Sequence, residues 1–223
     1  MKKYLIISLS VLLSCYVNMA LAGHDNIQIS NVTGRQFTVS WTTDEPCIAV
    51  LKLNDESGII KTCHDDRGEN ISSIIHYFTV KKLKSNTQYF FSVAYENMID
   101  DQKEFYHVTT GPGLFPLIGS RLASGQILNR DSKTPTSEAI VYITVIGTER
   151  NWTSALLSTC VNDDGYWDLE LFNARESDLQ KMFNVKRNGT SIIIHVDAGN
   201  SGTAEIEQSI SNGNNLHQSI VLD

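Results

Sequence analysis

The feature that most constrains this chain is a period-two alternation of apolar and polar residues in short runs. In the run 36–42, Phe37, Val39 and Trp41 alternate with small polar residues, and the run 88–96 again places aromatic and branched residues at every second position. Side chains of a β-strand point alternately to its two faces, so this pattern predicts strands with one apolar face. Because an apolar sheet face must be covered by another layer, the alternation favours a β-sandwich over a helical fold.

Seven such runs occupy the first half of the chain and are separated by residues that favour turns. That many short strands within about a hundred residues is typical of an immunoglobulin-like sandwich, which we predict for residues 23–110. The runs lie at 26–32, 36–42, 47–53, 58–63, 74–82, 88–96 and 103–109.

Two segments of this half resemble the fibronectin type III family. Residues 37–46 (FTVSWTTDEP) are similar to that family's second strand and the turn after it, and residues 76–89 are similar to the corner between its fifth and sixth strands. The resemblance implies that Trp41 is the core tryptophan. It also implies that Leu83 and Tyr89 belong to a tyrosine corner, in which the hydroxyl bonds back to the backbone. The chain contains no Arg-Gly-Asp tripeptide, so the resemblance does not imply integrin binding.

A segment rich in glycine and proline interrupts the strand pattern after Thr110, with the sequence GPGLFP at 111–116. Proline has no N–H to donate to a strand ladder and glycine adopts unusual dihedral angles, so regular structure is expected to stop here. We predict a linker at 111–119 between a first domain at 23–110 and a second at 120–223. The linker is short, so the two domains are expected to touch or to hinge within a few residues.

Strands are predicted to resume after the linker. The stretch Ala139–Ile146 is apolar at successive positions, which predicts a strand buried on both faces. The sequence Asn-Asp-Asp-Gly at 162–165 is typical of a hairpin turn, because Asp-Gly supplies the positive φ that a type I′ turn needs. Residues 177–183 fit either one or two helical turns or an irregular crossover loop. The expected strands lie at 125–128, 139–146, 155–161, 166–171, 191–196, 204–210 and 216–222.

This second half resembles the transthyretin-like sandwiches of carboxypeptidase regulatory domains and bacterial surface repeats. The resemblance is carried by residues 125–127, 139–143 and 162–169, and it covers about 120–222. It implies a second β-sandwich that is a non-catalytic accessory or stalk module. Trp167 lies in the alternating run within this segment, and we expect it to have a structural role.

The N-terminus has the form of an export signal. Two lysines precede an apolar stretch at 5–17, and the Ala-Leu-Ala at 20–22 fits a cleavage site flanked by small residues. We therefore expect residues 1–22 to be a signal peptide, and its short di-lysine start is typical of bacteria. The alternative is lipidation of Cys15, because residues 12–15 (LLSC) resemble a lipobox. Either route predicts a secreted, periplasmic or cell-surface protein.

Three cysteines follow the leader. Cys47 and Cys63 are expected on neighbouring strands, where an oxidising compartment would allow them to form a disulfide. Closing that short loop would contribute about 3 kcal/mol in the chain-entropy model. Cys160 is left unpaired, and we interpret it as a small buried apolar residue rather than a reactive thiol.

No constellation in the sequence predicts catalysis, and we expect no catalytic residues, no cofactor and no metal. The motifs Gly-x-Ser-x-Gly, the phosphate-binding glycine loop and the paired histidines of zinc proteases do not occur. The densest group of metal-ligating types is residues 63–66 (CHDD), but neighbours on a strand point to opposite faces, so a solvated loop is favoured. His76 and His195 fall within expected strands, where a structural histidine is favoured over a general base.

Charge and architecture narrow the function class. The net charge is −7, and about −9 without the two leader lysines, which disfavours nucleic acid. We expect a non-enzymatic interaction module or spacer outside the cytoplasm, with a protein or carbohydrate partner and no membrane contact except a lipid anchor at Cys15. An accessory protein of a secreted hydrolase and a lipid-anchored envelope protein are the alternatives. Five aromatic residues are candidates to face outward and bind a partner, or else to cap the opposite sheet face or pack between the domains: Tyr77, Phe90, Tyr106, Tyr142 and Trp152.

Overall fold

The computed structural model describes residues 26–55, 58–96, 105–115, 117–148, 152–185, 189–210 and 216–223. The predicted signal peptide and the lipidation of Cys15 lie outside the described residues. Within the described part of the chain, no helix is both long enough and apolar enough to cross a membrane.

The first half of the chain forms two antiparallel sheets. One sheet has the order β1-β2-β5 and the other has the order β4-β3-β6-β7. This arrangement of seven strands in two sheets is immunoglobulin-like, as the alternation predicted. The strands are β1 (Gln28–Ser30), β2 (Gln36–Cys47), β3 (Ala49–Asp55), β4 (Gly58–Cys63), β5 (Ser73–Lys81), β6 (Gln88–Tyr95) and β7 (Tyr106–Thr109).

The second half forms another pair of sheets, with the orders β10-β9-β12-β13 and β11-β8-β14. Their pairings are antiparallel except that β14 runs parallel to β8. Two short 3-10 helices lie at Leu171–Asn173 and Gly199–Ser201. The strands are β8 (Leu122–Leu128), β9 (Ile140–Ile146), β10 (Leu157–Cys160), β11 (Tyr166–Glu170), β12 (Ser191–Asp197), β13 (Thr203–Ser209) and β14 (Leu216–Val221).

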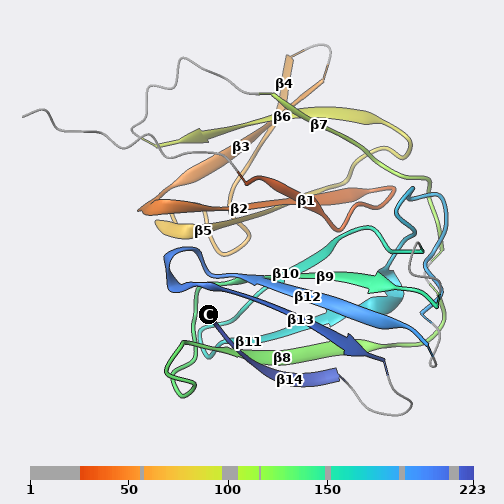
Figure 1. Ribbon diagram of the computed structural model, residues 1–223. Coiled ribbons are helices and arrows are strands. Elements are labelled where there is room, and N and C mark those ends of the chain that lie inside the picture. Colours follow the sequence, from red (N-terminus) through yellow and green to blue (C-terminus); the bar gives the residue numbers. More distant parts are fainter. Residues whose placement is uncertain are drawn as a thin grey trace, which may run out of the picture.

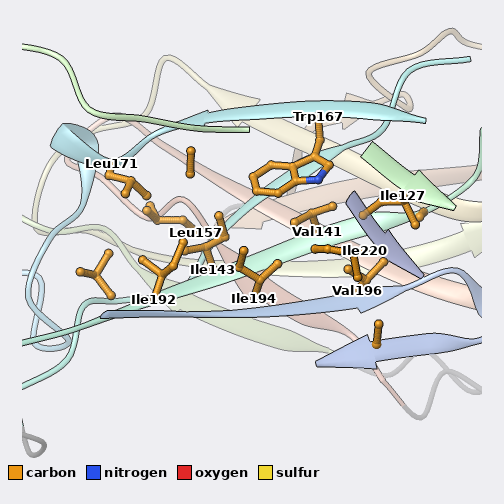
Figure 2. Packing of buried hydrophobic residues seen from close by; sticks show 14 of the residues in the cluster. Ile127, Val141, Ile143, Leu157, Trp167, Leu171, Ile192, Ile194, Val196 and Ile220 are labelled. Carbon is orange, nitrogen blue, oxygen red and sulfur yellow. The ribbon is translucent and has the colours of Figure 1, made fainter. Parts of the chain in front are cut away.

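Each sandwich has its own hydrophobic core, so the all-β prediction with two tandem sandwiches is confirmed. Phe37, Val39 and Trp41 of β2 point into the first core, as their alternation predicted. In the second core Trp167 packs above Val141 and among the branched residues of several strands (Figure 2). Burying a large apolar side chain of this kind contributes about 1.5–3 kcal/mol to stability.

The two sandwiches stack into four layers, and the sheets β1-β2-β5 and β10-β9-β12-β13 face each other in the middle (Figure 1). This stacking changes the environment of β2. Thr38 and Ser40 alternate with the core residues and so belong to the face predicted to be solvated, yet both are fully buried. The prediction of a half-buried strand is therefore wrong for β2, because the second sandwich covers its outer face. The same contact explains why β9 is buried on both sides, as its apolar sequence predicted.

The region at 177–183 forms turns and bends and no helix, so the crossover-loop alternative was the correct one. Arg175 pairs with Met182 in an isolated bridge, and the N–H of Leu179 donates to the carbonyl of Glu176. Leu179 adopts a positive φ of 65°, which a right-handed helix does not allow.

The expected disulfide between Cys47 and Cys63 is not formed, and both residues are free thiols. The prediction assumed neighbouring strands. In the structure β2 continues through Cys47 beside Ser73 of β5, whereas Cys63 ends β4 beside Leu51, so the two cysteines belong to different sheets. Cys160 is also a free thiol.

Candidate functional site at the seam between the sandwiches

The two middle sheets meet in a seam that is part apolar and part polar. Its apolar part is a cluster of Ile75, Tyr77, Ile140 and Tyr142. Both tyrosines are buried, so for these two the packing alternative was correct and neither is exposed to bind a partner. Burial raises the pKa of Tyr77 to about 12 and raises that of Tyr142 further, and both hydroxyls are therefore neutral hydrogen-bonding groups at physiological pH.

Asn31 is the residue that fastens the first sandwich to β10. Its backbone N–H donates to the carbonyl of Leu156 at 2.9 Å. Its side-chain amide donates to the carbonyl of Ser158 at 3.0 Å and accepts the N–H of Ser158 at 3.0 Å. The hydroxyl of Tyr77 donates to the same Ser158 carbonyl at 2.9 Å, and the Oγ atoms of Ser30 and Ser158 lie 2.6 Å apart. These contacts occupy the free edge of β10 with groups from the other sandwich.

Further hydrogen bonds cross the seam at some distance from Asn31. Ser40 Oγ lies 2.9 Å from the hydroxyl of Tyr142, and Ser73 Oγ donates to Glu138 Oε1 at 2.6 Å. At the far end of the seam, Asn200 Nδ2 donates to the carbonyl of Asp44 at 2.8 Å. Because these bonds join the first sandwich to the second, they oppose a hinge motion at the linker. Of the two arrangements expected from the short linker, the structure shows domains that touch.

The loop after Cys63, which is the group considered for metal binding, caps the free edge of β5. Asp65 Oδ2 accepts the N–H of Tyr77 at 3.0 Å, and Asp66 Oδ1 accepts the N–H of Thr79 at 3.0 Å. Arg67 forms an ion pair with Asp65 at 2.8 Å and also donates to the carbonyl of Ile75. Capping an exposed edge in this way prevents its pairing with another chain. Among the described residues, no three His, Cys, Asp or Glu side chains are grouped to hold a metal ion.

Cys47 and His76 form a pair that the sequence did not reveal, with Cys47 Sγ 3.4 Å from His76 Nε2. A thiol beside an imidazole can be a nucleophile and its base. Here burial raises the pKa of Cys47 and lowers that of His76 to about 4, so both groups are neutral. Activation needs the opposite shift of the thiol. His76 also stacks on Trp41 at 4.9 Å between ring centroids, which fits the structural role expected for it.

The remaining predicted structural residues take the following places. Trp41 Nε1 donates to the hydroxyl of Tyr95 at 3.0 Å within the first core. The hydroxyl of Tyr89 accepts the backbone N–H of Lys84 at 2.9 Å, which is the bond expected of a tyrosine corner, and Leu83 packs against the same core. Trp167 is buried in the second core, with no hydrogen-bond partner for its Nε1 in the described structure.

Three of the five aromatic candidates lie away from the seam. Phe90 is 37% exposed on β6, with its ring centroid 6.4 Å from that of His107. Tyr106 stacks on Phe91 at 5.4 Å, and Trp152 stacks on Phe183 at 4.4 Å. The structure therefore does not bring the five aromatics together into one binding face.

A pocket of about 210 Å³ lies at the seam, and sequence reasoning missed it. Asn31, Thr33 and Gln36 line it from the first sandwich, and Glu170 and Arg175 line it from the second. No local pattern could have found this pocket, because its two halves come from segments more than a hundred residues apart.

Arg175 and Glu170 provide the charges of the pocket. Arg175 is 6% exposed, and its Nη1 donates to the carbonyl of Pro112 in the linker at 2.8 Å. The carboxylate of Glu170 accepts the hydroxyl of Ser120 and the backbone N–H groups of Arg121 and Phe172. Partial burial opposes the ionisation of Glu170, but these hydrogen bonds outweigh it and lower its pKa, so the group is anionic at neutral pH.

Comparison with known proteins gives no family for this chain. No family model matches it, and no curated protein matches it either. Among solved structures, a central fibronectin type III array of RIM-binding protein is 16% identical, with a TM-score of 0.30, over 85% of this chain and 64% of that one. A pullulanase from Anoxybacillus is 12% identical, with a TM-score of 0.27, over 81% of this chain and 25% of that one.

A mutant of the shaft pilin SpaA from Lactobacillus rhamnosus GG is 9% identical, with a TM-score of 0.26, over 89% of this chain and 92% of that one. This chain therefore spans less than two thirds of the length of the first two of these matches. At such scores the likenesses say nothing about what this chain binds or does.

Proposed function

We propose that this chain is a non-catalytic module that works outside the cytoplasm as a rigid two-sandwich unit, holding a binding surface at a fixed position. The observation that carries the proposal is the seam, in which Asn31 and Ser158 join the two sandwiches by reciprocal hydrogen bonds. A chain of modules that must bend would keep a solvated, polar contact of limited size between them. Here one sheet of each sandwich packs against a sheet of the other, and the contact includes the buried side chains of Tyr77 and Tyr142.

The absence of catalysis is part of the proposal and is supported by the state of the titratable groups described above. Cys47, His76 and the two buried tyrosines are all held neutral by burial, and the carboxylate of Asp65 is occupied by Arg67 and by the edge of β5. These residues therefore have structural partners in place of the free, poised groups that acid–base chemistry needs.

The location and the finer identity of the modules also belong to the proposal. The export-signal pattern of residues 1–22 supports a place outside the cytoplasm. The resemblance of residues 125–127, 139–143 and 162–169 to transthyretin-like modules supports a stalk or accessory role for the second sandwich. The partner that we infer is a protein or a carbohydrate of the cell surface or of a secreted assembly.

Small-angle X-ray scattering of residues 23–223 tests the rigid arrangement. We expect a single conformation whose scattering is that of the stacked sandwiches. The Asn31→Ala variant should broaden the distance distribution, because it removes the amide that joins the sandwiches. Asn70→Ala is the matched control, since Asn70 is exposed and makes none of the hydrogen bonds described across the seam. A wild-type profile that requires an ensemble of open and closed arrangements would refute the proposal.

A further inference from the structure

The pocket at the seam contains a buried cation for which the described residues provide no counter-ion. Arg175 Nη1 donates to the carbonyls of Pro112 at 2.8 Å and Leu179 at 3.5 Å, and these are its hydrogen bonds within the described residues. No carboxylate of the described part of the chain pairs with Arg175. A buried charge is normally paired, because removing it from water is costly. A ligand anion bound in the pocket would therefore supply a counter-ion for the guanidinium of Arg175.

Arg175 lines the pocket and has donors that make no hydrogen bond within the described structure. A guanidinium has five N–H donors, and the carbonyls of Pro112 and Leu179 engage Nη1 alone. Nε and Nη2 of Arg175 are not among the fully buried polar atoms that lack partners, so both reach solvent, and the residue lines the pocket. These two nitrogens form one edge of the planar fork, the edge that binds a carboxylate through two parallel hydrogen bonds.

The surroundings hold Arg175 in place without a ligand. A Cβ atom on Gly111 would lie 2.8 Å from Nη1, so the linker backbone packs directly against the guanidinium. A Cβ atom on Gly34 would lie 2.6 Å from the carbonyl oxygen of Pro112, so the linker is confined from its other side as well. A donor fixed in this way loses little conformational entropy when an anion binds.

Size and charge limit the ligand. The pocket of about 210 Å³ is below the volume range of drug-sized sites. Glu170 adds a fixed negative charge to the same lining, which disfavours a multiply charged anion such as phosphate. The pair suits a small group that carries a carboxylate and, near it, an N–H donor. Such a group is found in a free amino acid and in the last residue of a peptide.

We propose that this pocket binds the carboxylate of an amino acid or of a peptide C-terminus, with Arg175 pairing with the carboxylate and Glu170 accepting an N–H of the same ligand. The site goes beyond the rigid-module function, and its test does not depend on whether the sandwiches stay fixed. In a module that presents a binding surface, this pocket would be the place where a ligand carboxylate binds.

The test follows the Arg175 Nε–H resonance of residues 23–223 by nuclear magnetic resonance during titration. The probes are glycine, the peptide Gly-Gly-Leu with a free C-terminus, the same peptide with an amidated C-terminus, and inorganic phosphate. We expect the free-acid peptide or glycine to shift this resonance and the amidated peptide to leave it unchanged. A response to the peptide alone identifies a C-terminus as the source, and an equal response to glycine identifies a free amino acid.

Variants separate binding from folding. Arg175→Gln should weaken carboxylate binding by at least tenfold in calorimetry, and Arg175→Lys, which keeps the charge but loses the fork, should weaken it less. Arg130→Gln is the matched control, because Arg130 is exposed and outside the pocket, and it should bind as the wild type does. If Arg175→Gln does not fold, the titration of the wild-type Arg175 Nε–H resonance still tests the proposal. No response to glycine or to the free-acid peptide, or an equal response to phosphate or to the amide, overturns the proposal.

Discussion

Asn31 allows the strength of the seam to be predicted from individual hydrogen bonds. Replacing it with alanine removes the partner of the Ser158 N–H, whereas the Ser158 carbonyl keeps the hydroxyl of Tyr77 as a donor. An unsatisfied backbone group costs about 1–3 kcal/mol, and because Asn31 is only partly buried we take the lower end for the Ser158 N–H. Asn31 also has a positive φ of 51°, a conformation that asparagine tolerates and alanine adopts at a cost of about 1 kcal/mol. Together these contributions predict a loss of about 2 kcal/mol in the free energy of unfolding.

Urea unfolding followed by tryptophan fluorescence and far-UV circular dichroism measures this loss. Trp41 reports on the first core and Trp167 on the second, so the fluorescence follows both sandwiches. We expect coincident transitions in the wild type, because the seam couples the two sandwiches, and separate transitions in Asn31→Ala. The control variant Asn70→Ala should change the free energy of unfolding by less than about 0.5 kcal/mol. If Asn31→Ala lost less than about 1 kcal/mol, the seam would not be held by these bonds.

Three further predictions test the environments of single residues. Burial lowers the pKa of His76 to about 4 from an ordinary 6.5, so stability that is present above pH 6.5 should be lost as the pH falls towards 4, by about 3 kcal/mol, and His76→Gln should remove this slope in urea titrations. Burial opposes the ionisation of Asp65 but hydrogen bonds from Arg67 and Tyr77 outweigh it and lower its pKa. Asp65→Asn should therefore cost about 1.5–3 kcal/mol at pH 7, and the difference from the wild type should shrink as the pH falls below 3.8; a difference independent of pH would contradict this. Gly165→Ala should cost at least about 1–2 kcal/mol by thermal unfolding, because Gly165 has a φ of 74° and a Cβ there would lie 2.7 Å from the carbonyl oxygen of Ile127; an unchanged melting temperature would disprove that turn geometry.

The alternation in the sequence was sufficient to predict the strands and the residues that share a face. Phe37, Val39 and Trp41 were assigned to one face of β2 and do form the first core. A turn at Asn162–Gly165 was also predicted from local chemistry, and the structure has one there, with the N–H of Gly165 donating to the carbonyl of Asn162 and Gly165 at positive φ. The prediction of a hairpin was wrong, because β10 and β11 belong to different sheets, and Asp163 and Asp164 lack the positive φ of a type I′ turn. Such features depend on dihedral preferences and on the two-residue period, which act within a few residues along the chain.

What lies against a strand face cannot be read from the strand itself. Thr38 and Ser40 have the sequence of a solvated face, and only the stacking of the second sandwich buries them. The role of Arg175 likewise could not be predicted from the sequence. Its surroundings include the linker carbonyl of Pro112 and pocket residues of the first sandwich such as Asn31, which only folding brings near it. The sequence by itself determined two β-sandwiches and their inward faces, because alternation is local. The tertiary structure decided the seam, the failed pairing of Cys47 with Cys63 and the pocket, because these depend on contacts between segments that the chain brings together only when it folds.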